Sequence, residues 1–195
     1  MLRVFTFERV AVVVSPWWEP GEPPELGTRV EVRLLPDEPH RGSESAAQRI
    51  VADLPVWRAD LFDRAGAPAG NLLSAHFHPG FDGVEPRSRA WPESLRQDPI
   101  AWLTGELGDL VALCVRSGRP DEGAGEPALG RDADAVRAAL PEIVAAVQRT
   151  WAEVRDRYRD PAAVQPAGLM FWLRRKMLSG SYFRFRPTSR SQLGP

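Results

Sequence analysis

Two histidines stand two residues apart in the segment His76-Phe77-His78-Pro79. We predict a strand over residues 72–78, on which alternate residues share a face, so both imidazoles project together and Phe77 enters the opposite face. Two imidazoles on one face can offer nitrogen ligands to a metal ion, or act as an acid and a base in proton transfer. A His-x-His pair on the solvated face of a hairpin also needs no function.

Further polar residues accompany this pair. Arg58 and Asp60 share one face of a strand predicted over residues 54–62, and Asp60 would bring a carboxylate to the histidines. Arg87 and Arg89 follow the histidines and are suited to hold a phosphate or a carboxylate. The candidate catalytic residues are His76, His78 and Asp60, and the candidate anion-binding residues are Arg87 and Arg89.

A metal site in this region lacks ligands in the sequence. Tetrahedral zinc needs a third and a fourth ligand, but no cysteine or further histidine lies nearby, and His40 falls in a predicted loop. We therefore expect a metal-free polar site and no cofactor. The single cysteine, Cys114, lies on the apolar stripe of a predicted helix and is expected in the core; no internal disulfide can form, which is typical of a reducing cytoplasm.

A second candidate site is the C-terminal segment 161–195, which has six basic and no acidic residues, interleaved with aromatic ones. Arg174, Arg175 and Lys176 are consecutive, so on a helix they spread over roughly 200° and cannot all pair with one acidic patch. Arginine with aromatic residues is the composition that grips phosphates and stacks bases, so nucleic acid is one candidate partner. A protein partner, a homo-oligomer, or pairing with the chain's own acidic surface are the alternatives.

Composition favours one ordinary folded domain over residues 1–195. The chain has 43% hydrophobic and 26% charged residues, which are values of globular proteins, and its net charge of -1 opposes strong non-specific binding of polyanions. No apolar run is long enough to span a bilayer, and the charged N-terminus is not a signal peptide. Arginine replaces lysine almost everywhere, as in high-GC bacterial genomes, and we expect a soluble cytoplasmic protein.

The first half of the chain reads as strands and the second half as helices. We predict strands over residues 3–14, 28–35, 54–62 and 72–78, with a loop over 15–27 and a short helix over 43–52. We predict helices over 99–117 and about 132–158, with a kink or break at Pro141, a loop over 118–131, a short helix over 168–178 and a late strand over 182–186. This order favours an α+β fold, in which a mostly antiparallel sheet of about four or five strands is covered by two long helices.

Two functions remain open at this point. The first, which we prefer, is an interaction or regulatory domain that uses the basic aromatic C-terminal segment. The second is a small hydrolase or nuclease-like enzyme, in which His76 and His78 are acid and base and Arg87 or Arg89 stabilises an anionic transition state. The second lacks a complete set of catalytic residues. A close approach of Asp60 or Glu85 to both imidazoles in a concave pocket would favour it.

Overall fold

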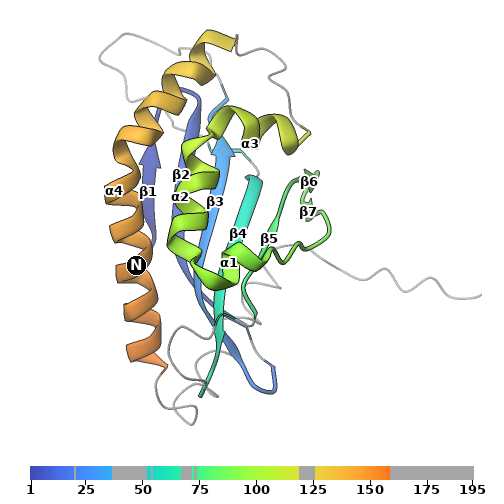
Figure 1. Cartoon of the computed structure of the whole chain (residues 1–195), viewed down its shortest axis with the longest axis vertical. Helices are drawn as coiled ribbons and strands as arrows, with labels where there is room; N and C mark the ends of the chain where they lie inside the picture. The colour runs from blue at the N-terminus through green and yellow to red at the C-terminus, as the bar shows by residue number, and fades with distance from the viewer. Residues whose placement is uncertain are drawn as a thin grey trace, which may run out of the picture.

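The computed structural model describes residues 1–19, 21–36, 52–53, 55–66, 72, 74–118 and 126–158. These residues form an α+β fold built on an antiparallel sheet of five strands in the order β1-β2-β3-β4-β5 (Figure 1). The strands are β1 (Arg3–Thr6), β2 (Val10–Glu19), β3 (Glu25–Leu34), β4 (Pro55–Arg64) and β5 (His76–His78). A second, two-stranded sheet pairs β6 (Phe81–Asp82) with β7 (Glu85–Pro86). The predicted fold class is confirmed at this level.

The N-terminal segment 3–14, which we predicted as one strand, is the hairpin β1–β2. The chain reverses after Thr6, and the backbone N–H of Phe7 donates to the carbonyl of Val10. A distant group holds this turn: the carboxylate of Asp132 accepts the backbone N–H groups of Glu8, Arg9 and Val10 at 2.9, 2.7 and 3.0 Å. The residues near this turn do not predict it, because the carboxylate that stabilises it lies more than a hundred residues away in the sequence.

The predicted loop over 15–27 is mostly strand. β2 continues to Glu19 and β3 begins at Glu25, and the two residues are opposite each other in the register. Pro16 had suggested a break. The pairing of β2 with β1 extends only to Val14, which is opposite Arg3, the first residue of β1. Pro16 therefore lies in the part of β2 that is an edge strand, where proline is tolerated. The predicted strand over 72–78 is shorter than expected, since only His76–His78 pairs, antiparallel to β4 as predicted.

Four helices are described: α1 (Glu93–Gln97), α2 (Pro99–Gly108), α3 (Leu110–Arg116) and α4 (Glu126–Arg157). The segment 99–117, predicted as one helix, is two, because Asp109 ends α2 and caps α3 by accepting the N–H of Ala112 at 3.2 Å. Asp98 caps α2 in the same way, as the Asp-Pro pair predicted. The described residues therefore contain one long helix and three short ones, and the expectation of two long helices is not confirmed.

The long helix α4 runs through Pro141 without the break that was one of the two alternatives there, and residues 126–131 of the loop predicted over 118–131 are helical. Proline removes one backbone hydrogen bond, but apolar side chains anchor the helix to the sheet before and after it. Val136, Ile143 and Val147 are each 0% exposed. Packing of this face outweighs the local cost of the proline.

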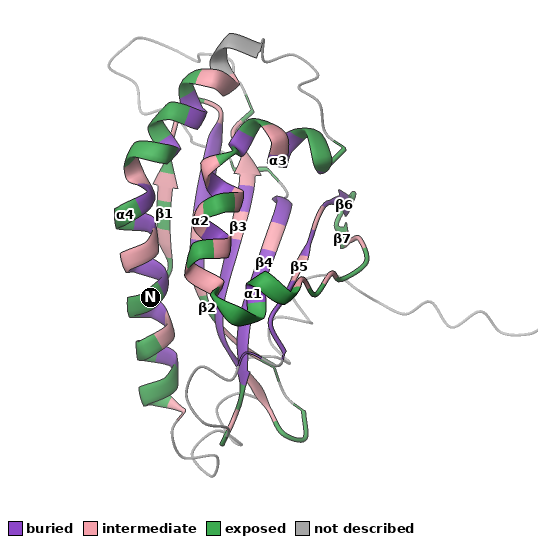
Figure 2. Ribbon diagram, in the orientation of Figure 1, coloured by how far each residue is buried: buried purple, intermediate pink, exposed green. Residues whose placement is uncertain are grey.

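The described helices lie on one face of the sheet, and the core is between the two layers (Figures 1 and 2). The predicted contact residues Leu103, Leu107, Leu110 and Val147 are buried in it, whereas Val144 and Trp151 are half-buried. Cys114 is buried in the core, as expected. No described helix is long and apolar enough to cross a membrane.

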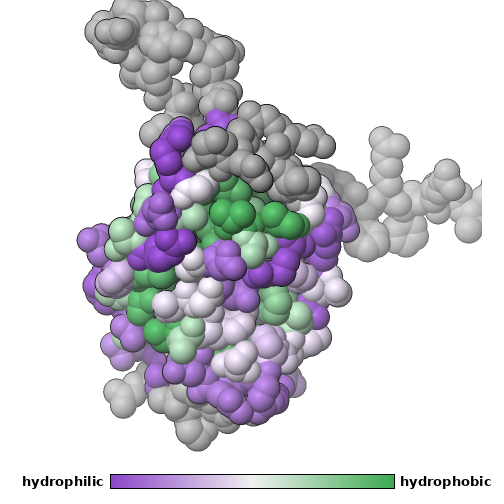
Figure 3. Space-filling model, turned by 45° about the horizontal axis from the view of Figure 1, so that its top comes forward, coloured by the Kyte–Doolittle hydropathy of each residue, from purple (hydrophilic) through white to green (hydrophobic). Residues whose placement is uncertain are grey.

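The upper end of the molecule shows an area of apolar surface among hydrophilic residues (Figure 3). Exposed apolar side chains of the short helix α3 are Val111 and Val115, which are 41% and 61% exposed and one helical turn apart.

The predicted elements over 43–52, 168–178 and 182–186 lie outside the described residues.

Candidate functional site

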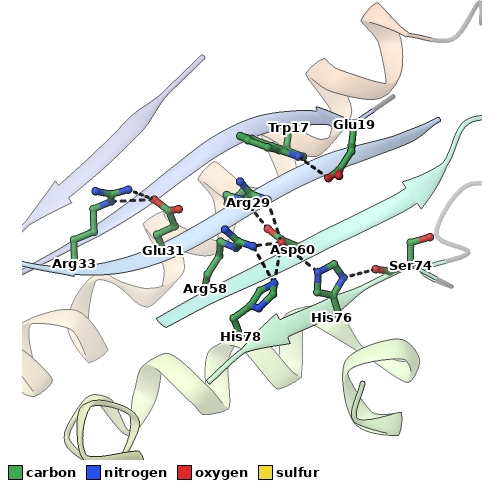
Figure 4. A network of polar contacts seen from close by, with 10 residues as sticks. All are labelled: Trp17, Glu19, Arg29, Glu31, Arg33, Arg58, Asp60, Ser74, His76 and His78. Atoms are coloured by element: carbon green, nitrogen blue, oxygen red, sulfur yellow. Dashed lines mark hydrogen bonds and ion pairs between the residues drawn. The ribbon is translucent and has the colours of Figure 1, made fainter. Parts of the chain in front are cut away.

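The sheet register places the candidate residues in two adjacent rows. His76 is opposite Asp60, which is opposite Arg29, and His78 is opposite Arg58. Directly opposed residues of antiparallel strands share a face, so all five side chains lie together on the face away from the described helices (Figure 4). The prediction that His76 and His78 share a face is thus confirmed.

Phe77 lies on the other face, as predicted. It is half-buried and packs against the core, where its ring is 6.3 Å from that of Trp57 and 5.2 Å from that of Trp102. This aromatic cluster anchors β5 to the helical layer. The anchoring determines which way the two flanking histidines point.

Asp60 is the centre of the cluster and is only 1% exposed. Its Oδ1 accepts Nε of Arg29 at 2.6 Å, and its Oδ2 accepts Nη2 of the same guanidinium at 3.1 Å. Nε of Arg58 lies 3.2 Å from Oδ2. Burial alone would raise the pKa of Asp60, but contacts with His76, Arg29 and Arg58 outweigh burial and hold the pKa below its usual value. The carboxylate is therefore ionised at neutral pH.

His78 is a neutral side chain with both nitrogens engaged. Its Nδ1 donates to the backbone carbonyl of Arg87 at 2.7 Å, which leaves the lone pair of Nε2 to accept Nη2 of Arg58 at 2.9 Å. Burial lowers the pKa of His78 to about 4, and the charge of Arg58 acts in the same direction, against the carbonyl of Arg87. His78 therefore orients the guanidinium without adding charge.

His76 is 2% exposed and its Nδ1 donates to the backbone carbonyl of Ser74 at 2.8 Å. Its Nε2 lies 3.3 Å from Oδ2 of Asp60, a contact that is an ion pair only when the imidazole is protonated and that does not meet the geometry of a hydrogen bond. The ring also meets Phe62 edge-on, with centroids 6.1 Å apart. Of the four imidazole nitrogens, this Nε2 is the one with no hydrogen bond to a described residue.

Asp60, His76 and His78 together offer three metal-ligand atoms within 4.8 Å of one another. Sequence analysis named Asp60 as a carboxylate beside the histidines, and the β4–β5 register places it opposite His76. The donor set fits a transition metal, but its charge environment does not. Arg58 already occupies the lone pair of His78, and two guanidiniums share the carboxylate, so a divalent cation would be repelled.

A segment after β7 extends the two rows. Phe77 and Ala90 form an isolated antiparallel bridge, with hydrogen bonds of 3.0 and 2.9 Å in the two directions. Ala90 therefore faces the helices with Phe77, and its neighbours Arg89 and Trp91 face the histidines. In this register Arg89 is beside His78 and Trp91 is beside His76, whose ring centroid is 6.1 Å from that of Trp91.

Arg89, a residue singled out in the sequence, therefore lies beside the cluster. It is exposed, and its charge is one of those that lower the pKa of Arg58, after burial as the main cause. Sequence reasoning did not place Arg29 or Trp91 beside the histidines. Arg29 belongs to the polar side of a strand with alternating residues. That alternation predicts which face of the sheet Arg29 lies on, but not which residue it contacts.

The side chain of Arg87, in contrast, points away from the cluster. Its Nε donates to Asp82 at 3.0 Å and its Nη1 to the carbonyl of Ser117 at 3.2 Å, at the C-terminal end of α3. A Cβ at Gly118 would lie 2.9 Å from that Nη1. Arg87 contributes only its backbone carbonyl to the site.

Arg174, Arg175 and Lys176, the other candidate binding residues, lie outside the described residues.

A pocket of about 460 Å³ lies elsewhere, between the ends of β3 and β4 and the last turns of α4, and Asp63, Arg64, Arg155 and Tyr158 are among its lining residues. None of the candidate site residues lines it. The polar cluster and this pocket are therefore at different places in the structure.

No protein-family model, curated protein or solved structure matches this chain.

Proposed function

We propose that this chain is an oxyanion-binding domain, and that Arg58 and Arg89 hold a carboxylate or phosphate group on the outer face of the sheet. The observation that carries this proposal is an excess of positive charge that is built into the sheet. Arg29 and Arg58 share one carboxylate, that of Asp60, and Arg89 adds a further charge beside Arg58.

The count of charges supports an anionic ligand. Glu31, the remaining acidic residue of these rows, is engaged by Arg33 through two hydrogen bonds of 2.9 and 2.7 Å. Three guanidiniums, those of Arg29, Arg58 and Arg89, then face one carboxylate, an excess of two positive charges among the described residues. Any proton gained by a histidine increases this excess. An anion relieves it, whereas a metal ion worsens it.

The available donors point the same way. Arg58 directs Nε toward Asp60 and Nη2 to His78, which leaves Nη1 without an acceptor among the described residues. Arg89 has no ion pair in the described part of the chain. A guanidinium held in place on two sides, beside a second one at the surface, is suited to bind an oxyanion through charge-assisted hydrogen bonds.

The cost of the cluster supports a functional role. Apolar side chains of similar volume often stabilise a fold as well as a buried ion pair does. Here a buried carboxylate, a guanidinium and an imidazole all have shifted pKa values within one small region. Such groupings occur preferentially at functional sites.

Isothermal titration calorimetry with inorganic phosphate and with acetate, at low ionic strength, tests the proposal. We expect binding that Arg89→Glu weakens by about tenfold or more, the effect of one charge-assisted contact. Arg96→Glu, on the exposed helix α1, makes the same charge change away from the site and should leave affinity unchanged. Absence of binding to the wild-type protein, or equal effects of both variants, would refute an anion site at Arg89.

Proton transfer, as in the hydrolase hypothesis, is the second candidate. The approach of Asp60 to both imidazoles, at 3.3 and 3.8 Å, favours it. Against it, each Nδ1 is bound to a backbone carbonyl and Nε2 of His78 is bound to Arg58. Only Nε2 of His76 is left for a substrate, and it faces a carboxylate.

The interaction-domain hypothesis concerns residues 161–195, which lie outside the described residues, and stays a prediction.

A further inference from the structure

We infer that the ligand of this site carries a planar aromatic ring next to its anionic group, and that Trp91 stacks on that ring. The inference rests on the proposed oxyanion site and specifies which class of anion the site takes.

The exposure of Trp91 is the first argument. Among the described residues it is the one tryptophan in the exposed class, with 55% of its surface accessible. One side of the indole is near His76, with ring centroids 6.1 Å apart and planes inclined by 42°. The rest of the ring faces solvent. A large aromatic ring fixed on one side and open on the other is a stacking platform, as in sites that bind bases or aryl groups.

The position of Trp91 relative to the charges is the second argument. Trp91 and Arg89 are two residues apart on an extended segment, so they share a face and their Cα atoms are about 6.6 Å apart. The bridge between Phe77 and Ala90 fixes this face as that of His76 and His78. A ring that bears an acidic group directly, or through one or two bonds, spans the gap between the indole and the guanidinium.

Trp17 cannot take the same role, which makes the assignment specific. The guanidinium of Arg29 lies 3.5 Å from the centroid of the Trp17 ring, so a ring face of Trp17 is already covered by a cation. Trp17 contacts Arg29 at one end of the row Arg29-Asp60-His76, and Trp91 is near His76 at the other end. Only the end at Trp91 combines an open ring with the exposed Arg89.

Matched pairs of probes test the inference by calorimetry at constant ionic strength: inorganic phosphate against phenyl phosphate, and acetate against benzoate. In each pair the second probe carries a phenyl ring that the first lacks. We expect the ring to tighten binding to the wild-type protein by about tenfold. In Trp91→Ala this advantage should disappear while affinity for phosphate and acetate stays unchanged. In Trp91→Phe, which keeps a ring, most of the advantage should persist.

The outcomes separate this inference from the proposed function. If phosphate or acetate binds but the ring gives no advantage, or if Trp91→Ala keeps the advantage, stacking on Trp91 is overturned and the oxyanion site stands. If none of the four probes binds, the proposed site is refuted and the inference with it. Because Trp91 is exposed, its variants should fold, and an unchanged circular dichroism spectrum and Tm check this.

Discussion

Asp60 and His76 face each other across β4 and β5 as a register pair, with Oδ2 and Nε2 3.3 Å apart and both side chains almost fully buried. The pair lies on the sheet face away from the described helices, where a sheet would usually be polar and solvated. Burial of an ionised carboxylate there makes its partners indispensable. The first prediction follows from this dependence.

Asp60→Asn should destabilise the protein by about 3–5 kcal/mol, because it leaves the buried guanidinium of Arg29 and the half-buried guanidinium of Arg58 without their counter-charge. Urea unfolding followed by circular dichroism measures the change. Asp82→Asn is the matched control, since Asp82 is 75% exposed and pairs with Arg87 at the surface. It should cost at most about 1 kcal/mol. Equal, small losses in the two variants would contradict the role given to Asp60.

Stability should fall as the pH drops from about 6.5 to about 4. Burial depresses the pKa of His78 from 6.5 to about 4, so in this window the unfolded chain binds a proton that the folded chain does not. The stabilisation is complete above the unfolded pKa and is lost as the pH falls through the folded one. Unfolding free energies measured at half-unit pH steps should show this slope.

His78→Gln cannot titrate, and its stability should therefore vary less with pH across that window than the stability of the wild type does. A variant slope as steep as that of the wild type would mean that another group carries the effect.

Asp132→Asn should cost about 3 kcal/mol, because the carboxylate of α4 accepts three backbone N–H groups of the β1–β2 turn. Hydrogen exchange should show the loss first at Glu8, Arg9 and Val10. The neighbouring Asp134, whose side chain is 80% exposed, provides a control variant. If Asp134→Asn destabilises the protein as much, the turn is not held by Asp132.

Two glycine substitutions should act in opposite directions. Gly118 has a φ of +74°, and an added Cβ would meet the guanidinium of Arg87, so Gly118→Ala should destabilise by about 1–2 kcal/mol. Gly105 is exposed within α2 and a Cβ there meets nothing within 4 Å, so Gly105→Ala should stabilise by about 0.5–1 kcal/mol. Thermal unfolding distinguishes the two signs; a stabilising Gly118→Ala would contradict the close packing of Arg87 against Gly118.

The sequence was sufficient for those features that depend on neighbouring residues. Alternation of valines with Arg29, Glu31 and Arg33 predicted a strand with one apolar face, and the spacing of His76 and His78 placed them together. The pair Asp98-Pro99 predicted the start of α2. Hydrophobic periodicity and helix capping depend on residues only a few positions apart, so both can be predicted from the sequence before the fold is known.

Tertiary structure decided the rest. A shift of one residue between β4 and β5 would turn both histidines to the other face, and no local pattern specifies that register. Register also brought Arg29 to Asp60, and the bridge at Ala90 brought Arg89 and Trp91 to the histidines. Pro141 stayed inside a helix because packing of the whole α4 face outweighs one lost hydrogen bond. The site is assembled from strands far apart in sequence, and the balance of its charges exists only once those strands pair.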